Sequence, residues 1–460
     1  MSRRVAYAAF IMAISMVAAG CSSPSGHAVP PPVTTTTASS STSFISTTIP
    51  DTKVGAQLAW FLAAVSDVPL SAQVIDVHFN PQVLEEVSAD AFNASLEEFS
   101  PPSGASLVGL LSADPTSLVA VATFGTGNWK VMMSVDSTGL IDKLLLTPSP
   151  AQPSWAEIDR QLKALAPHAG LLAAEVSNGV CRPIHQVASS TARPLGSEFK
   201  LFVLGALADQ VSTGRLGWTQ ELTVRDALKS VGNAEGSGSL EFSPAGTEIS
   251  VQQTATKMIS ISDNTAADML INLVGRSAVE SQVRKWSSDS TLDVPFLTTR
   301  ELFILHYVNY PTLANAYLAL PPTKRAAYLA SSVDPLSLND VQGSTEPRAI
   351  DSIEYFASPD DICRAFAGLQ QLSDQQKLSP LASILSVNHG GLGLNQTQWP
   401  TVWFKGGSEP GVLTLGYLAK NTKGQTFVVS AMVSNPTTAL APSATGALLE
   451  IAQGAFDLVG

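Results

Sequence analysis

The chain has 460 residues, of which 45% are hydrophobic and only 14% are charged. This composition supplies enough apolar material for at least one large core, and the length favours two or three domains. The formal net charge of -12, with 26 lysines and arginines, argues against nucleic-acid binding, which requires a basic surface facing the phosphates. The histidines and cysteines show no zinc-ligand spacing, so a zinc site has no support in the sequence.

Residues 1–20 have the form of a secretory signal. Two arginines precede an apolar run over residues 6–19 that is too short to span a membrane comfortably. The string Ala18-Ala19-Gly20-Cys21 resembles a bacterial lipobox, although Ala18 stands where Leu is more common. The resemblance implies that Cys21 receives a lipid and becomes the new amino terminus. The alternative is an ordinary signal peptide followed by an incidental cysteine.

Residues 21–50 are dominated by Ser, Thr, Pro, Ala and Val, and none of them carries a charge. A stretch of this composition cannot bury enough apolar surface to fold, so it is predicted to be a flexible tether. A tether directly behind a candidate lipidated cysteine favours a secreted protein, anchored by lipid to the outer face of the bacterial cell membrane.

Residues 51–150 are predicted to form a small α+β domain. Helical periodicity begins at Asp51, and a second helical stretch covers residues 83–99. Four short apolar runs separated by turn residues predict an antiparallel meander at 107–111, 118–124, 129–135 and 140–146. The order of helices and strands resembles the NTF2-like fold. This domain shows no catalytic constellation, and we expect it to contribute nothing to the chemistry.

A linker at 148–153 leads into a second domain, residues 154–460. A helix is predicted at 155–165, and Asn178-Gly179 is a hairpin signal between two strands. The chain is then mainly helical from Ser197 to Leu369 and closes with a helix at 443–459. The predicted strands are 171–176, 180–187, 402–405, 414–418 and 426–433. Strands from both ends of the domain must therefore meet in one sheet, with the helical middle inserted as a lobe.

The first candidate for chemistry is Gly196-Ser197-Glu198-Phe199-Lys200, which opens a strongly apolar helix. Ser197 and Lys200 stand three residues apart and share a helix face, so the amine can reach the hydroxyl. An apolar setting lowers the pKa of Lys200 and favours a neutral amine able to take the serine proton. By itself this motif is weak, because Ser-x-x-Lys occurs by chance in most chains of this length.

Two further strings follow, Ser262-Asp263-Asn264 and Lys405-Gly406-Gly407-Ser408. Separately, the first is an ordinary helix cap and the second an ordinary glycine bulge or turn. Together with Ser197-x-x-Lys200, their order is similar to the triple signature of class A β-lactamases and penicillin-binding D,D-peptidases. Similar flanking text extends the resemblance over 171–460, at 242–247, 264–275 and 358–361. The resemblance implies an antiparallel sheet flanked by helices, with an all-α lobe.

By this resemblance, the implied catalytic residues are Ser197, Lys200, Ser262 and Lys405. The serine at 197 is the nucleophile, and the lysine at 200 is its base or proton relay. The hydroxyl of 262 passes the proton to the leaving nitrogen, while the lysine at 405 tunes that hydroxyl and attracts a substrate carboxylate. The implied substrate-binding residues are Asn264, Gly407 and Ser408. The backbone N–H groups of 197 and 408 form the oxyanion hole, and no metal or organic cofactor is needed.

The sequence departs from the family pattern at two places. Gly406 stands where the family usually offers a Thr or Ser hydroxyl to the substrate carboxylate. The Glu-x-x-Leu-Asn string whose glutamate activates the deacylating water in class A β-lactamases is also absent. Glu301 lies at a plausible place for that role, with Glu346 and Glu354 as alternatives. Without such a base the acyl-enzyme persists.

The leading interpretation is a monomeric serine hydrolase that acts on β-lactams or a related peptide, amide or ester. The alternatives are a D,D-peptidase or esterase with little β-lactamase activity, and a catalytically silent tethered binding module. An α/β-hydrolase is disfavoured because no Gly-x-Ser-x-Gly elbow occurs. Cys181 and Cys363 could pair in an oxidising compartment or remain buried thiols, and the sequence leaves this open.

Overall fold

A computed structural model of the chain describes residues 45–86, 88–97, 105–124, 127–148, 154–231, 239–289, 293–338, 341 and 344–460. The chain divides into two compact units, 1–152 and 153–460. The predicted signal segment, Cys21 and the tether up to residue 44 lie outside the described residues. Of the helices that are described, none is both long and apolar enough to cross a membrane.

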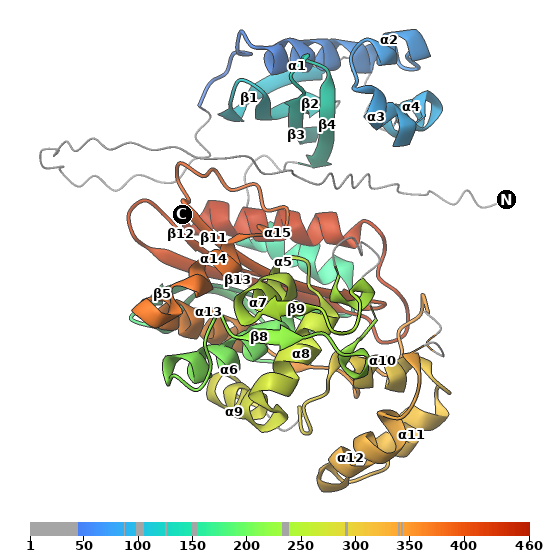
Figure 1. The fold of residues 1–460 in the computed structure, drawn as a ribbon. Coiled ribbons are helices and arrows are strands. Elements are labelled where there is room, and N and C mark those ends of the chain that lie inside the picture. The colour runs from blue at the N-terminus through green and yellow to red at the C-terminus, as the bar shows by residue number, and fades with distance from the viewer. Residues whose placement is uncertain are drawn as a thin grey trace, which may run out of the picture. The chain divides into compact units, whose positions relative to one another are not determined.

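The first unit places helices against a four-stranded antiparallel sheet of order β1-β2-β3-β4 (Figure 1). Its elements are α1 (Lys53–Ala64), α2 (Ala72–Asp76), α3 (Pro81–Glu86), α4 (Ala89–Glu97), β1 (Ala105–Ala113), β2 (Ser117–Phe124), β3 (Gly127–Val135) and β4 (Ile141–Pro148). The meander agrees with the prediction. The single helix predicted over 83–99 is wrong, because a new helix starts after Ser88, whose hydroxyl accepts from Ala91 N at 3.2 Å.

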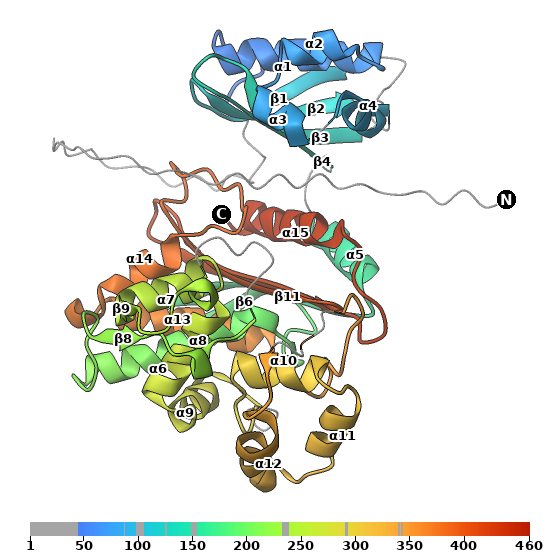
Figure 2. The same ribbon diagram turned by 45° about the vertical axis from the view of Figure 1, so that its right-hand side comes forward.

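The second unit is built on a five-stranded antiparallel sheet of order β11-β12-β13-β5-β6. The strands are β5 (His168–Ser177), β6 (Val180–Val187), β11 (Thr401–Glu409), β12 (Val412–Lys420) and β13 (Thr426–Ser434). The pairing of β13 with β5 confirms that strands from both ends of the domain share one sheet. Helices α5 (Trp155–Leu165) and α15 (Ala444–Val459) cover one face, and the helical lobe lies on the other (Figures 1 and 2).

Alternation along the strands separates the two faces of this sheet. Leu171 and Ala173 of β5 belong to the core beneath α5 and α15, whereas Leu172 and Ala174 face the helical lobe. This is the period of two that an extended strand imposes on its side chains. The lobe face is the one that carries the candidate site, because Lys405, Gly416, Ser430 and Leu172 stand in one cross-strand row.

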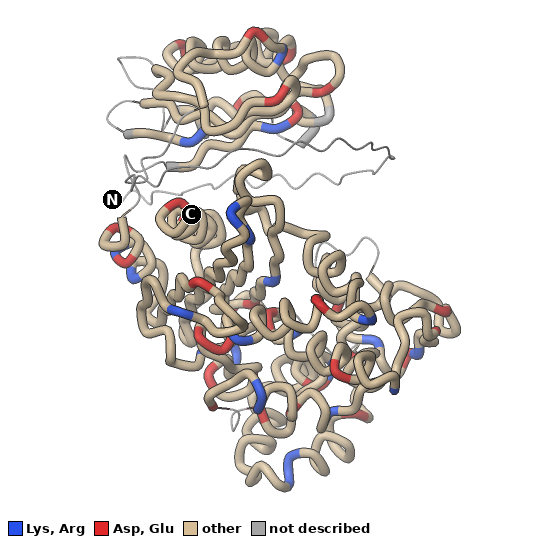
Figure 3. Tube along the Cα trace, turned by 90° about the vertical axis from the view of Figure 1, so that its left-hand side faces the viewer, with Lys and Arg blue, Asp and Glu red and all other residues tan. Residues whose placement is uncertain are grey.

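The lobe and its connections supply the remaining elements. These are β7 (Arg193–Pro194), α6 (Lys200–Ser212), β8 (Glu221–Thr223), β9 (Glu248–Ser250), α7 (Val251–Ser260), α8 (Asn264–Val274), α9 (Arg276–Trp286), α10 (Thr299–Tyr307), α11 (Thr312–Leu318), α12 (Pro322–Tyr328), β10 (Phe356–Ala357), α13 (Pro359–Ser373) and α14 (Pro380–Ser386). A disulfide between Cys181 and Cys363 joins β6 to α13, which settles the pairing that the sequence left open. Acidic and basic positions are interspersed along this unit in the view of Figure 3.

Candidate active site

The candidate nucleophile stands in a short 3₁₀ turn, Gly196–Phe199, that leads directly into α6. Gly196 has φ +50°, a left-handed conformation that glycine adopts without strain. Its N–H donates to Glu354 Oε1 at 2.7 Å, and Leu195 N donates to Tyr355 O at 2.9 Å. The turn is therefore fixed to a distant segment of the chain, and it places Ser197 Oγ 3.0 Å from Lys200 Nζ.

The second motif lies where α7 ends and α8 begins. Asp263 is the N-cap of α8, accepting from Ala266 N at 2.9 Å and from Leu240 N at 2.7 Å. Asp263 therefore caps the helix, as the sequence pattern predicts for an Asx residue at this position. Ser262 has φ +57°, an uncommon conformation for a residue with a side chain and one that clusters at functional sites. Both of its oxygens contact Lys200 Nζ, the carbonyl at 2.6 Å and the hydroxyl at 3.1 Å.

The third motif lies on β11, and its lysine contacts the same hydroxyl from the sheet. Lys405 Nζ donates to Ser262 Oγ at 3.0 Å and to Gly406 O at 2.6 Å. The three sequence motifs thus form one connected network in which Ser262 Oγ lies between two lysine amines. Ser197 and Ser262 are partly exposed, whereas both lysines are buried.

Four oxygens surround the Lys200 amine, and two of them can only accept. These are Ser262 O at 2.6 Å and Asn264 Oδ1 at 2.7 Å. A neutral amine has two protons and one lone pair, so donation to these two acceptors leaves the lone pair for a serine hydroxyl. The lone pair can then accept the Ser197 proton. This geometry allows Lys200 to act as a base towards the Ser197 hydroxyl.

Burial explains why the amine can be neutral near physiological pH. Removal from water lowers the pKa of Lys200 well below its ordinary value, and the positive charge of Lys405 lowers it further. Burial also lowers the pKa of Lys405, to about 7, and the negative charge of Glu198 opposes this change. Two buried amines that share one hydroxyl cannot easily both be charged, so the two lysines titrate as a coupled pair.

The nucleophile turn and β11 run so close together that only glycine fits between them. A side chain on Gly407 would begin 2.0 Å from Leu195 O and 2.5 Å from Ser197 N. A side chain on Gly196 would begin 2.9 Å from Ser408 N. The two backbone N–H groups assigned by resemblance to the oxyanion hole, those of 197 and 408, therefore lie on adjoining backbone segments.

Two further positions behave in ways that the sequence did not reveal. The Asn264 amide is used within the protein, since Oδ1 accepts from Lys200 Nζ and Nδ2 donates to Val231 O at 2.8 Å. It therefore positions the base in addition to any contact with substrate. Gly406 is confined as well, because a Cβ there would lie 2.8 Å from Thr414 O and 2.9 Å from the Phe404 ring.

The three carboxylates considered for water activation occupy different surroundings. Glu301 is buried, and both of its oxygens are engaged, Oε1 by Arg276 Nη2 and Oε2 by Thr298 N, each at 2.7 Å. These contacts close a capping box at the start of α10. Glu346 is exposed. Glu354 accepts from Gly196 N and so supports the nucleophile turn from behind.

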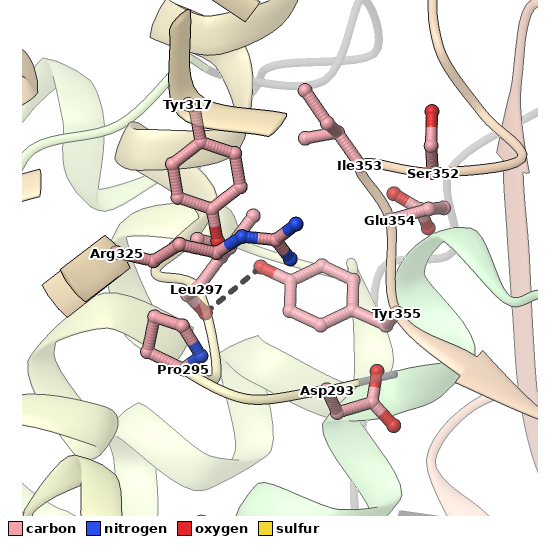
Figure 4. A pocket seen from close by; sticks show the side chains of 9 residues that line it. All are labelled: Asp293, Pro295, Leu297, Tyr317, Arg325, Ser352, Ile353, Glu354 and Tyr355. Carbon is pink, nitrogen blue, oxygen red and sulfur yellow. Dashed lines mark hydrogen bonds between the residues drawn. The ribbon is translucent and has the colours of Figure 1, made fainter. Parts of the chain in front are cut away.

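Glu354 belongs to a buried acidic pair that sequence reasoning did not find. Burial and the neighbouring Glu409 raise the pKa of Glu354 well above its ordinary value, and burial raises that of Glu409 to about 8. The pair therefore retains at least one proton at neutral pH. A cavity of about 10 Å³ lies beside this segment, with Tyr355 Oη donating to Leu297 O at 3.1 Å (Figure 4). Its size suits about one water molecule and excludes a substrate.

The fold and the network define a class of protein: an antiparallel sheet with a helical lobe, carrying two serine hydroxyls bridged by buried lysines. The sequence profile of the "Beta-lactamase enzyme family" matches residues 155–459, and the chain belongs to that family. A second profile, "ORF 12 gene product N-terminal", matches residues 49–141. A comparison with curated protein sequences found no match.

Several solved structures resemble about two thirds of this chain. A β-lactamase from Sphaerobacter thermophilus is 19% identical, with 66% of this chain and 96% of that chain covered and a TM-score of 0.45. A β-lactamase from Chitinophaga pinensis is 16% identical, with 66% and 98% covered and a TM-score of 0.46. A point mutant of PBP-A, solved as an acyl-enzyme complex with penicillin G, is 18% identical, with 66% and 97% covered and a TM-score of 0.43.

Proposed function

We propose that this protein is a serine hydrolase that is acylated on Ser197 by β-lactams or a related amide or ester, and that it releases the acyl group slowly. The observation that carries the proposal is the set of contacts around the Lys200 amine. Two of its neighbours, Ser262 O and Asn264 Oδ1, can only accept hydrogen bonds, so a neutral amine that donates to both keeps its lone pair for the Ser197 hydroxyl. Membership of the β-lactamase family supports the same chemistry.

In this mechanism Ser197 Oγ attacks the substrate carbonyl carbon, and Lys200 takes the hydroxyl proton. Backbone N–H groups on the turn and on β11 stabilise the oxyanion, a contribution of roughly 2.7–4 kcal/mol per donor in comparable sites. When the carbon–nitrogen bond breaks, Ser262 donates its proton to the leaving nitrogen and is reprotonated from Lys200. Lys405 holds the Ser262 hydroxyl in place and attracts a substrate carboxylate. The base is neutral again when the acyl-enzyme has formed.

Slow release follows from the carboxylates around the site. A fast β-lactamase needs a base that activates water next to the acyl group, and Glu301 has both oxygens engaged by Arg276 and Thr298. This observation favours D,D-peptidase-like or esterase-like behaviour with little β-lactamase activity. The natural substrate in this proposal is a small amide, peptide or ester, and the protein acts as a monomer.

Labelling of the mature protein with a fluorescent penicillin tests the proposal. We expect one adduct, mapped to Ser197 by mass spectrometry, that forms faster than it decays. Ser197→Ala should abolish it, while Ser383→Ala, at an exposed serine of α14, should label like the parent. An adduct on another residue would contradict the assignment of the nucleophile. No adduct with any penicillin or activated ester would favour a catalytically silent binding module.

We propose in addition that Cys21 carries a lipid that anchors the protein to the outer face of the bacterial cell membrane. The basic start, the apolar run, the Ala-Ala-Gly-Cys string and the uncharged tether support this proposal. Cys21→Ala should move the protein from the membrane to the soluble fraction. If the variant stays with the membrane and the intact mass of the parent contains no lipid, the anchor is wrong.

A further inference from the structure

Glu198 is a carboxylic acid buried completely within the turn that carries the nucleophile, with 0% of its surface exposed. Throughout the described chain, neither of its oxygens accepts a hydrogen bond of normal geometry. The adjacent Thr414 hydroxyl uses its proton on Leu195 O at 2.9 Å. A buried carboxyl without a donor costs free energy, and such a group in a folded protein points to a role beyond packing.

The sheet leaves a place for this carboxyl at Gly416. A Cβ on Gly416 would lie 2.1 Å from Glu198 Oε1, so the carboxyl fills the space that a side chain there would take. Gly416 stands directly opposite Lys405 on β11 and opposite Ser430 on β13. Cross-strand partners have Cβ atoms about 4.5–5.5 Å apart. Glu198 therefore lies between the side chains of Lys405 and Ser430 in one row of the sheet.

Ser430 places a hydroxyl in the same cross-strand row as Lys405 and Glu198. Its hydroxyl is buried, and no hydrogen-bond partner for it occurs among the residues that the structure describes. A hydroxyl next to Glu198 in the row can turn its proton towards an ionised carboxyl. The lobe face thus holds a cation, an acid and a hydroxyl side by side in otherwise apolar surroundings.

The groups that face Lys405 come from several elements. The turn supplies Glu198, α6 supplies Lys200, and Ser262 lies between the two lysines. From α13, the side chains next to Gly416 are those of Ile362 and Phe366, which carry no charge. The charges of three other acids raise the pKa of Lys200, namely those of Asp263, Asp268 and Glu354. Glu198 is therefore the carboxyl whose charge raises the pKa of Lys405.

We propose that Glu198 is a positioning residue whose ionised carboxyl favours the charged form of Lys405 and directs that amine at Ser262 Oγ. The inference rests on the proposed function, in which a charged Lys405 holds the relay hydroxyl and attracts a substrate carboxylate. Burial lowers the pKa of Lys405 and the Glu198 charge opposes that change, which together leave this pKa at about 7. Burial in turn raises the pKa of Glu198 to about 8, and the Lys405 charge opposes that change, so the proton affinities of the two groups are linked. Loss of the carboxylate should therefore let Lys405 lose its proton at a lower pH.

The direct test is the pKa of Lys405, read from its ε-carbon NMR signal in protein labelled at lysine. The signal is assigned by its absence in Lys405→Arg. Glu198→Gln should lower this pKa by about one unit or more, the size expected when a neighbouring opposite charge is removed. Asp293→Asn is the matched control, because Asp293 is a buried carboxyl that accepts from Phe356 N at 2.9 Å and is not one of the charges that shift the pKa of Lys405. The control should leave the pKa of Lys405 unchanged.

A kinetic measurement links the same group to catalysis. The alkaline limb of the pH profile for acylation by fluorescent penicillin should move to lower pH in Glu198→Gln by the same amount. If Glu198→Gln does not fold, Glu198→Met replaces the carboxyl with an apolar group of similar size and carries the same expectation. An unchanged Lys405 pKa in a folded variant overturns the proposal. A parent that never labels refutes the proposed function instead, and the NMR result still decides whether Glu198 controls the charge of Lys405.

Discussion

Replacement of Gly407 by alanine is the sharpest test of the candidate oxyanion hole. The new Cβ would lie 2.0 Å from Leu195 O and 2.5 Å from Ser197 N, whereas real Cβ atoms essentially never come within 3.0 Å of another heavy atom. Both close neighbours are backbone atoms, so they cannot swing away. The turn and β11 must therefore separate by about 1 Å.

A shift of this size is large compared with the tolerance of an oxyanion hole, whose donors must lie about 2.7–3.1 Å from the oxyanion. A 1 Å misplacement can cost about 10²-fold in rate, and loss of one donor costs about 10²–10³-fold. We therefore expect acylation of Gly407→Ala to be about 10²–10³-fold slower than that of the parent. The expected change appears in the second-order rate constant for labelling by fluorescent penicillin.

Gly217→Ala provides the matched control, because a Cβ at Gly217 meets nothing within 4 Å and its φ is not in the left-handed region. It should label at the parent rate. Circular dichroism and thermal unfolding would show that Gly407→Ala is folded. A folded Gly407→Ala that acylates as fast as the parent would refute the assignment of these N–H groups to the oxyanion hole.

The contacts of the second unit support four other predictions. Lys200→Ala should slow acylation by about 10²–10⁴-fold at unchanged fold, since it removes the general base; labelling at the parent rate would exclude Lys200 from that role. Glu301→Gln should leave the decay of the adduct unchanged. It should lower the free energy of unfolding by about 1–3 kcal/mol, because the Glu301 carboxylate holds Arg276 and the start of α10. Accumulation of adduct in this variant would instead make Glu301 the deacylating base. Burial lowers the pKa of His306 from 6.5 to about 4, so this residue contributes stability that is present above pH 6.5 and lost as the pH falls to about 4. The loss amounts to up to about 3 kcal/mol in urea titrations, and it should be absent in His306→Gln. Cys363→Ser should destabilise the protein by about 2–5 kcal/mol, since the disulfide closes a separation of 182 residues; an unchanged urea midpoint would show that the bond does not form.

Local patterns were sufficient to predict most of the architecture. Short apolar runs marked the strands, and turn residues marked their ends, because both depend on neighbouring residues in the chain. The prediction failed over 83–99, where the apolar period continued past Ser88 although that residue caps a new helix. At the site, the order of three short strings was enough to select the residues that the fold brings into one network. Their chemical roles remain predictions.

Only the tertiary structure decided which groups surround those residues. The contact between Gly196 N and Glu354 joins positions 158 residues apart, and the pairing of Cys181 with Cys363 spans 182. No local pattern encodes such contacts. Sequence placed Glu301 plausibly for water activation, but Arg276 engages it. The string Ser-Glu-Phe-Lys contains Glu198, but nothing in the string indicates that the Glu198 carboxyl is buried in the same cross-strand row as Lys405. That position exists because Gly416 leaves a space in a strand more than 200 residues away, which only the folded sheet brings beside the nucleophile turn.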